Sequence, residues 1–326
     1  MSIWIGIDVS KNKLDCAWTL ENKKNHIIVS NNKVGFNKML KECPDDSKFV
    51  MEATGTYYLN CALFLNNNKY HVSVENPYRI KNHMRSDMNR AKNDKIDAIS
   101  IAKFGIEKNP EPWFAISKDI LKIQQLRASL SLIVKQIVAL KNQIHAFSQS
   151  DFADKDTIRM VSQTICYLEK KKKILGDKMI KVAKANFKEE FNLIISIPGI
   201  GEITTASLLG CIMDFNRFPS SRHLISFLGL SPTNRQSGSS LNLKGKICKM
   251  GNSDMRSLLY VCSSVAIQYN EACRNMFFRQ KERGKQGNVP MVCVMNKLVK
   301  QIYGVVKSKT PYSKEIALGS KRIALA

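Results

Sequence analysis

The sequence predicts an α/β domain followed by a mostly α-helical region, and three changes along the chain support that fold class. Short β-rich and helix-like stretches alternate through about residue 112, as in a sheet covered by helices. Apolar residues then repeat at heptad spacing over residues 113–190. Residues 191–326 begin with a glycine-containing turn between helix-like segments. We therefore expect three domains, at residues 1–112, 113–190 and 191–326.

The first segment contains four short strands and two helical stretches. The strands are predicted at residues 3–9, 27–30, 48–51 and 71–74, one helix at residues 57–66, and a second helix that begins near Asp94 and runs to Phe104. Residues 3–9 follow Met1 with no basic leader and no cleavage site, so they are expected to form the first strand of a cytoplasmic domain.

The second segment carries an apolar seam whose residues are spaced alternately three and four apart. Its first run comprises Ile123, Leu126, Leu130, Ile133, Ile137, Leu140, Ile144 and Phe147. Its second run keeps the same register, with Lys172 at one seam position, and comprises Ile158, Val161, Ile165, Leu168, Leu175, Met179 and Val182. Turn-type residues separate the runs, so we expect two coiled-coil helices that link domains or mediate oligomerisation. The pattern leaves open whether they pair within one chain or across a dimer.

The third segment opens with Ile197-Pro198-Gly199-Ile200-Gly201 between two helix-like stretches. Such a turn is typical of a helix-hairpin-helix motif, in which glycine N–H groups approach a phosphate without reading the base sequence. A tight helix–helix turn with no ligand is the alternative. The segment continues with a serine-rich stretch at residues 235–242, a basic stretch at 244–249 and helices to about residue 309.

The charge balance indicates a polyanionic partner. The chain has 51 Lys and Arg against 27 Asp and Glu, a net charge of +24 and a pI near 9.7. A membrane surface is disfavoured because no uninterrupted apolar run reaches the roughly 18 residues of a spanning helix. The nine cysteines are scattered with no Cys-x-x-Cys pair, so we expect reduced thiols and no zinc site.

Four acidic residues stand out in this basic chain. Asp8 and Glu52 end two of the predicted strands, while Asp94 and Asp97 lie three apart at the start of a predicted helix. Carboxylates from two strand ends and one helix can hold a pair of Mg²⁺ ions about 4 Å apart for phosphodiester cleavage. Taken singly, each has a structural alternative: Asp94, for example, could serve only as a helix N-cap.

The motifs around these residues resemble one known family. Gly-Ile-Asp-Val-Ser-Lys, Glu-Ala-Thr-Gly-Thr-Tyr, Lys-Asn-Asp-Lys-Ile-Asp-Ala, Ile-Pro-Gly-Ile-Gly and Ser-Gly-Ser-Ser occur here in the order seen in the DEDD transposases of the insertion sequence 110 family. The resemblance covers nearly the whole chain. It implies a RuvC-like N-terminal domain of RNase H-like fold and a C-terminal transposase domain with a catalytic serine. It also implies a structured non-coding bridge RNA that pairs with donor and target DNA, and a dimer or tetramer whose active sites are shared between protomers.

The resemblance assigns roles to residues by position. Asp8, Glu52, Asp94 and Asp97 match the quartet that binds Mg²⁺, with two ions per site and Mn²⁺ as a substitute, and Ser237 matches the nucleophile. A covalent serine–DNA intermediate would conserve the phosphodiester energy for rejoining, so that no ATP is required. Residues expected to contact nucleic acid are Gly199, Gly201, Arg235, Ser239, Lys244, Lys246 and Lys249.

Three other functions remain open from the residues alone. A RuvC-like nuclease would use the carboxylates with water as nucleophile, leaving Ser237 in a solvated loop. A non-catalytic RNA- or DNA-binding scaffold would need the charge but not the carboxylates. A sugar-kinase-like ATPase ranks last, because the chain lacks a second glycine-rich phosphate loop.

Overall fold

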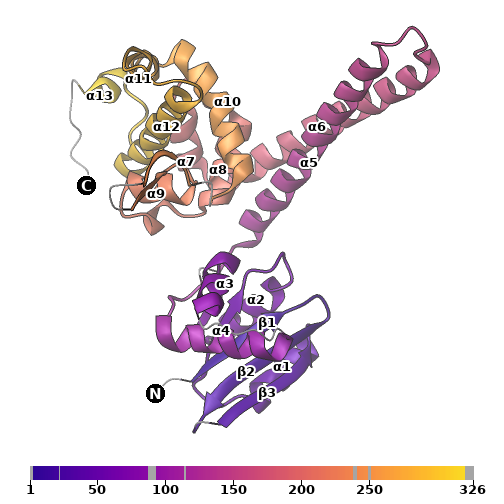
Figure 1. The fold of residues 1–326 in the computed structure, drawn as a ribbon, viewed down its shortest axis with the longest axis vertical. Helices are drawn as coiled ribbons and strands as arrows, with labels where there is room; N and C mark the ends of the chain where they lie inside the picture. The colour runs from indigo at the N-terminus through magenta and orange to yellow at the C-terminus, as the bar shows by residue number, and fades with distance from the viewer. Residues whose placement is uncertain are drawn as a thin grey trace. The chain divides into compact units, whose positions relative to one another are not determined.

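The computed structural model describes residues 3–21, 23–86, 93–113, 115–237, 241–248 and 251–319, without the side chains of residues 233–237 and 241–246. The chain forms two compact units, Met1–Ala115 and Ile116–Ala326 (Figure 1). Each unit is described separately below.

The N-terminal unit is built on a five-stranded sheet of order β3-β2-β1-β4-β5. Its strands are β1 (Trp4–Val9), β2 (Lys13–Leu20), β3 (Lys23–Ser30), β4 (Lys48–Glu52) and β5 (Val72–Glu75). The first three are antiparallel, whereas β4 pairs in parallel with β1 and β5 in parallel with β4. This mixed sheet fits a RuvC-like domain. Parallel pairing brings the carboxyl ends of β1, β4 and β5 to one edge of the sheet.

The strand predictions were correct for β1, β4 and β5 and incomplete for the antiparallel part of the sheet. Strand β2 was missed because its buried central residues combine Asp15 with small and aromatic residues, and so show no apolar alternation. Residues 27–30 do form a strand, but they pair with β2 rather than with β1.

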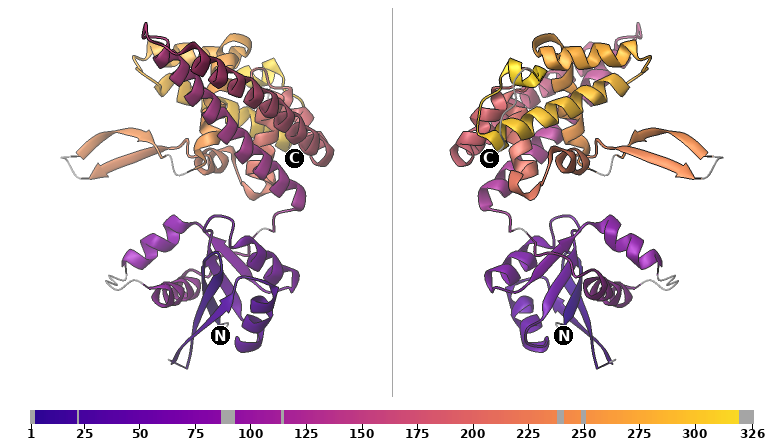
Figure 2. Two further views of the ribbon diagram at one scale, coloured as in Figure 1. Left: turned by 90° about the vertical axis from the view of Figure 1, so that its right-hand side faces the viewer. Right: turned by 90° about the vertical axis from the view of Figure 1, so that its left-hand side faces the viewer.

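Helices cover both faces of this sheet (Figure 2). One face buries Ile5, Ile7 and Val9 against α1 (Lys33–Glu42) and α2 (Leu59–Asn67). On the other face Trp4 and Val50 meet α4 (Asp94–Lys108), beside which lies α3 (Pro77–Ser86). Alternate residues of β1 therefore face opposite cores, as the two-residue period of a strand requires.

Close contact between β1 and α4 depends on Gly6. A Cβ atom there would lie 2.2 Å from both the Ala98 carbonyl oxygen and the Ala102 nitrogen, which are helix backbone atoms. We expect Gly6→Ala to lower the free energy of unfolding of this unit by about 3 kcal/mol, because α4 must move away. All three tryptophans lie in this unit, so their fluorescence during urea unfolding reports on it.

Gly304→Ala is the matched control, because a Cβ at Gly304 would meet nothing within 4 Å. Circular dichroism should show unfolding of Gly304→Ala unchanged or slightly more stable. Equal stability of Gly6→Ala and the unchanged protein would contradict the tight β1–α4 contact.

The C-terminal unit is mostly helical. Its helices are α5 (Lys118–Phe147), α6 (Lys155–Asn186), α7 (Lys188–Ile195), α8 (Glu202–Ile212), η1 (Phe215–Arg217), α9 (Ser221–Phe227), α10 (Ser253–Tyr269), α11 (Glu271–Glu282), α12 (Val289–Ser308) and α13 (Lys314–Leu318). A two-stranded ribbon, β6 (Pro232–Ser237) and β7 (Leu241–Ile247), interrupts them.

Helices α5 and α6 pack side by side as a long hairpin (Figure 1). The predicted seam residues are buried or partly buried along both helices, apart from Phe147, and Ile120, Gly176 and Ala183 outside the seam are buried as well. At the base of the hairpin, Ile123, Leu130 and Met179 join the core formed by the later helices. A separate domain at residues 113–190 stays a prediction.

Among the described helices, α12 alone is long and apolar enough to cross a bilayer. Its apolar face belongs to the core of the C-terminal unit, where Val294, Leu298 and Ile302 are almost fully buried. Packing between helices therefore accounts for its composition.

Candidate active site

Four carboxylates lie in a row across one face of the N-terminal sheet. The strand register places Asp8 beside Asp15 and Glu52 beside Glu75. Asp8 and Glu52 are level with each other, because each follows a residue of the matched pair Ile7 and Met51. The row therefore runs Asp15–Asp8–Glu52–Glu75 across β2, β1, β4 and β5.

Each of the two outer carboxylates pairs with a protein cation, Asp15 with Lys13 and Glu75 with Arg79. Asp15 lies 3.1 Å from Lys13 Nζ and 3.0 Å from His26 Nε2. Glu75 accepts a hydrogen bond of 2.7 Å from Arg79 Nη1. Among the described residues, no cationic group lies within salt-bridge distance of the inner pair, Asp8 and Glu52. Negative charge in the row is thus left uncompensated at its centre.

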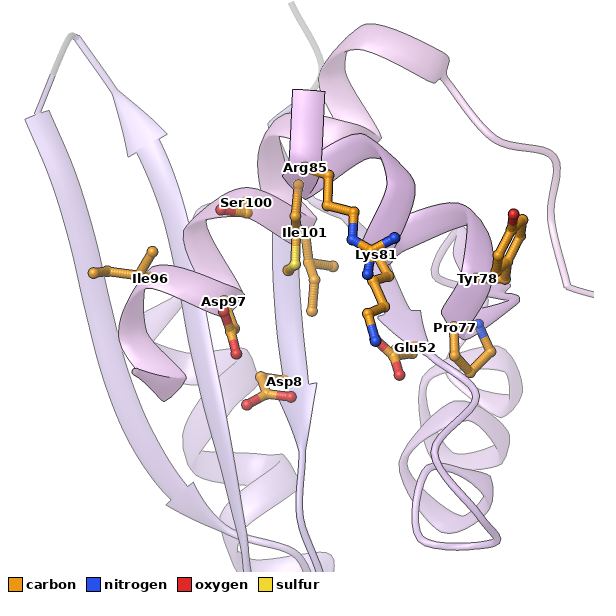
Figure 3. A pocket seen from close by; sticks show the side chains of 11 residues that line it. Asp8, Glu52, Pro77, Tyr78, Lys81, Arg85, Ile96, Asp97, Ser100 and Ile101 are labelled. Atoms are coloured by element: carbon orange, nitrogen blue, oxygen red, sulfur yellow. The ribbon is translucent and has the colours of Figure 1, made fainter. Parts of the chain in front are cut away.

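Helix α4 brings Asp97 to the same place. Asn93 caps the helix, its side chain accepting a hydrogen bond of 2.8 Å from Ile96 N, so Asp94 and Asp97 fall in the first turn. The possibility that Asp94 is itself the cap is therefore wrong. Figure 3 shows Asp97 and Asp8 pointing toward each other in a pocket of about 580 Å³, which Glu52 also lines.

Of the four predicted metal ligands, Asp94 alone does not line this pocket. Its Oδ2 accepts a hydrogen bond of 2.7 Å from Lys13 Nζ, and its side chain is about half exposed. Lys13 thus joins Asp94 to the outer carboxylate Asp15. Asp94 is still close enough for its charge to act on Asp8.

The crowding of acidic groups perturbs Asp8. Burial, followed by the charges of Asp97, Asp94, Asp15 and Glu52, raises the pKa of Asp8 to about 6. A bound divalent cation would relieve this repulsion, and an all-carboxylate donor set suits Mg²⁺ or Mn²⁺. As the side chains stand, no three acidic, His or Cys side chains among the described residues are close enough to hold one ion. The donors fit a divalent metal by chemistry, and binding would have to draw them together.

The raised pKa of Asp8 predicts how stability depends on pH. Folded Asp8 keeps its proton up to about pH 6, whereas the ordinary carboxyl titrates at 3.8. The folded state therefore binds more protons in this window, and the free energy of unfolding falls as pH rises through it. We expect Asp8→Asn to raise that free energy in metal-free protein at about pH 8 by about 1 kcal/mol, allowing for the partial exposure of Asp8. At about pH 4 its effect should largely vanish.

Tryptophan fluorescence during urea unfolding measures the free energy of unfolding of the N-terminal unit at each of the two pH values. The same stability increment at both pH values, or a loss of stability at about pH 8, would contradict the electrostatic crowding of Asp8.

The sequence interpretation missed the other wall of this pocket. Helix α3 contributes Pro77, Tyr78, Lys81 and Arg85 to the lining of the pocket, and Lys81 and Arg85 extend toward the carboxylates (Figure 3). The available signal was the spacing of Tyr78, Lys81 and Arg85, three and four residues apart on one helical face.

In the C-terminal unit, the glycine turn connects α7 and α8 as predicted. Gly199 has a φ of +100° there, and a Cβ atom would lie 2.7 Å from Ala266 of α10. Gly201 is exposed and forms the N-cap of α8. Gly199 therefore has a conformational and packing role, while phosphate binding at this turn stays a prediction.

The serine-rich stretch at residues 235–242 includes the paired ends of β6 and β7, so residues 235–237 and 241–242 do not form a loop. Ser237 is the last residue of β6 and pairs with Leu241, the first residue of β7. Strands β6 and β7 contain Arg235, Ser237, Lys244 and Lys246, and the structure describes the backbone of these residues without their side chains. Ser239 and Lys249 lie outside the described residues.

Comparison with known proteins finds similarity to transposases. Residues 5–150 match an IS110-type DEDD model described as a transposase, and residues 191–277 match the transposase IS116/IS110/IS902 family. The pilin gene-inverting proteins of Moraxella bovis and Moraxella lacunata are each 28% identical over 96% of this chain and 98% of their own length. The transposase for insertion sequence element IS1111A of Coxiella burnetii is 28% identical over 56% of each chain.

Proposed function

The chain belongs to the IS110 family of transposases and is a DNA-recombining enzyme, and we propose that it cuts and rejoins donor and target DNA under the guidance of a structured bridge RNA. The observation that carries this proposal is the pocket in which Asp8, Glu52 and Asp97 converge while Asp8 and Glu52 have no salt bridge among the described residues. An acidic centre in a chain of net charge +24 suits a metal-dependent reaction on a polyanion.

Within this proposal, Asp8, Glu52 and Asp97 hold divalent cations, with Mg²⁺ as the physiological choice. Asp94 joins them by leaving Lys13, to which it is hydrogen-bonded here. Bound cations would lower the proton affinity of an attacking hydroxyl and stabilise charge on the phosphate and the leaving oxygen. The proposed metal ligands position the cations: they are Asp8, Glu52, Asp94 and Asp97. Helix α4 sets the approach of Asp97 to Asp8.

We assign the nucleophile to Ser237. Its Oγ forms a bond to the scissile phosphorus as the bond from phosphorus to the leaving strand oxygen breaks. The serine hydroxyl loses a proton and the leaving oxygen gains one. A hydroxyl of the incoming strand reverses the step, so the phosphodiester is restored without ATP. Two features support this assignment: Ser237 is the last residue of β6, and it opens the Ser-Gly-Ser-Ser motif that resembles the catalytic serine motif of the family.

The partners follow from charge and from the family. Sequence specificity is proposed to come from base pairing with the guide RNA, while Gly199, Gly201, Arg235, Ser239, Lys244, Lys246 and Lys249 contact phosphates. The protein is proposed to act as a dimer or tetramer in which one protomer supplies Ser237 to the carboxylates of another.

Inversion of a DNA segment is a second candidate outcome of the same chemistry. The relatives that match 96% of this chain are named pilin gene-inverting proteins. Inversion recombines two sites in inverted orientation on one molecule, whereas insertion joins sites on two molecules.

A reconstituted reaction tests the proposed function. Purified protein is incubated with plasmids carrying the flanking DNA of its gene and with RNA transcribed from that DNA, in Mg²⁺ or in EDTA. We expect rejoined recombinant DNA only when RNA and Mg²⁺ are both present. Nicked products without rejoining would favour the nuclease, and DNA binding without any cleavage would favour the scaffold. Sites placed in inverted orientation on one plasmid distinguish inversion from insertion.

A further inference from the structure

The second wall of the active-site pocket is basic and aromatic, unlike the acidic wall opposite. It consists of Tyr78, Lys81 and Arg85 on α3. Figure 3 shows Lys81 and Arg85 extending from this helix into the pocket, across from Asp8 and Asp97. Acidic groups alone would repel a phosphodiester. The cations in the same pocket can attract its phosphates, so both walls can contact one nucleic-acid strand.

The orientation of α3 is held from behind. Ile80 is fully buried, and the His83 ring packs edge-on against Phe104 of α4 with centroids 5.3 Å apart. His83 Nε2 also lies 3.0 Å from Glu107 Oε2 on α4. Asn76 accepts a hydrogen bond of 2.8 Å from Tyr78 N at the start of the helix. These contacts fix which face of α3 is turned to the pocket.

The cations beside the two outer carboxylates have acidic partners, whereas Lys81 and Arg85 have none among the described residues. Arg79 is paired with Glu75, and Lys13 with Asp15 and Asp94. Within the described part of the chain, Lys81 and Arg85 make no salt bridge, although three carboxylates line the same pocket. Both side chains are exposed and four residues apart, so their charges are available to neighbouring phosphates of one strand.

Tyr78 adds a stacking surface at the edge of the same pocket. Tyr78 is 57% exposed, so its ring is accessible to a ligand in the pocket. A base within a double helix stacks on its neighbours and hides both of its faces, so a base that stacks on this ring has left the duplex. The pocket volume of about 580 Å³ also suits a short stretch of one strand rather than a duplex.

We propose that α3 binds an unpaired segment of the DNA strand being cut, with Lys81 and Arg85 on phosphates beside the scissile one and Tyr78 stacked on a neighbouring base. This assignment rests on the proposed function and names the form in which the substrate enters the site. Strand opening then precedes cleavage, and the acidic wall receives a phosphodiester that the basic wall has already positioned.

Binding and crosslinking of full-length protein test this assignment without any cleavage step. The probe is a fluorescent single-stranded DNA oligonucleotide carrying one 5-iodouracil, with Ca²⁺ in place of Mg²⁺. The variants are Lys81→Gln with Arg85→Gln, and Tyr78→Ala. The matched control is Lys38→Gln with Lys41→Gln, which removes two exposed charges from α1 on the opposite face of the sheet. Thermal melting should leave all variants unchanged, because these side chains are exposed.

We expect the Lys81 and Arg85 double variant to bind the strand about tenfold more weakly. The slope of log affinity against log salt concentration should decrease in magnitude by about one to two. Exchanging the two cations, Lys81→Arg with Arg85→Lys, should restore affinity. Irradiation should crosslink the iodouracil to a peptide containing Tyr78, and Tyr78→Ala should lose that crosslink.

Affinity of the Lys81 and Arg85 double variant equal to that of the α1 control, or crosslinks that avoid α3, would overturn the assignment. Preference of the same crosslink for an RNA strand over DNA would also overturn it and give α3 to the guide. A protein that passes this test but forms no recombinant DNA refutes the proposed reaction rather than the strand-binding role of α3.

Discussion

Replacing Asp8 by Asn is expected to slow DNA cleavage by about 10³-fold or more, while leaving the protein folded and more stable at neutral pH. Asp8 lies at the centre of the carboxylate row, with Asp97 pointing toward it from α4. Loss of its charge removes one proposed metal ligand and relieves the repulsion that contributes to raising its pKa to about 6. An inactive variant that resists urea better than the unchanged protein would separate catalysis from folding.

Asp45→Asn is the control for this substitution. Asp45 is exposed in the loop before β4, at the opposite end of that strand from Glu52. Its replacement should leave both cleavage and stability unchanged. Cleavage by Asp8→Asn at an unchanged rate would exclude the pocket as the active site.

Replacing Ser237 by Ala is expected to abolish recombination and any protein–DNA adduct that survives denaturation. Without the hydroxyl, the bond between protein and phosphorus cannot form, and the strand has no stored phosphodiester to rejoin. The measurement is electrophoresis of labelled DNA after heating in detergent, in which the adduct migrates with the protein. We expect at least 10³-fold less adduct than with the unchanged chain.

Ser239→Ala is the matched control, since it removes an equal side chain two residues away. Its adduct should form normally. If Ser239→Ala lost the adduct and Ser237→Ala kept it, the nucleophile would move to Ser239. Cleavage without any adduct in the unchanged protein would favour water as nucleophile and the nuclease alternative.

The inner residues of the site could be predicted from the sequence because each follows a recognisable local pattern. Asp8 and Glu52 close apolar strands, and parallel strands end at a common edge of a sheet. Asp97 follows a capped helix start, one turn inside α4. Short-range sequence patterns therefore correctly identified three of the four predicted metal ligands as residues that line one pocket.

The remaining features depend on which strands pair, and single-chain patterns do not encode that directly. Asp15 belongs to the site only because β2 pairs with β1 in a register that sets it beside Asp8. Its contact with His26 comes from a third strand, so this contact could not be predicted from spacing along the sequence. The role of α3 was missed for the same reason, because only the tertiary packing of α3 on α4 turns Lys81 toward the carboxylates.

The position at which the protein binds a divalent metal tests most directly whether this pocket is the catalytic centre. Full-length protein is loaded with Fe²⁺ in place of Mg²⁺, and ascorbate with peroxide then cleaves the backbone close to the ion. We predict fragments that end near Asp8, Glu52 and Asp97, reduced by excess Mg²⁺ and absent in Asp8→Asn. Fragments that end only within Ile116–Ala326, or fragments that persist unchanged in Asp8→Asn, would contradict the assignment of this pocket as the catalytic centre.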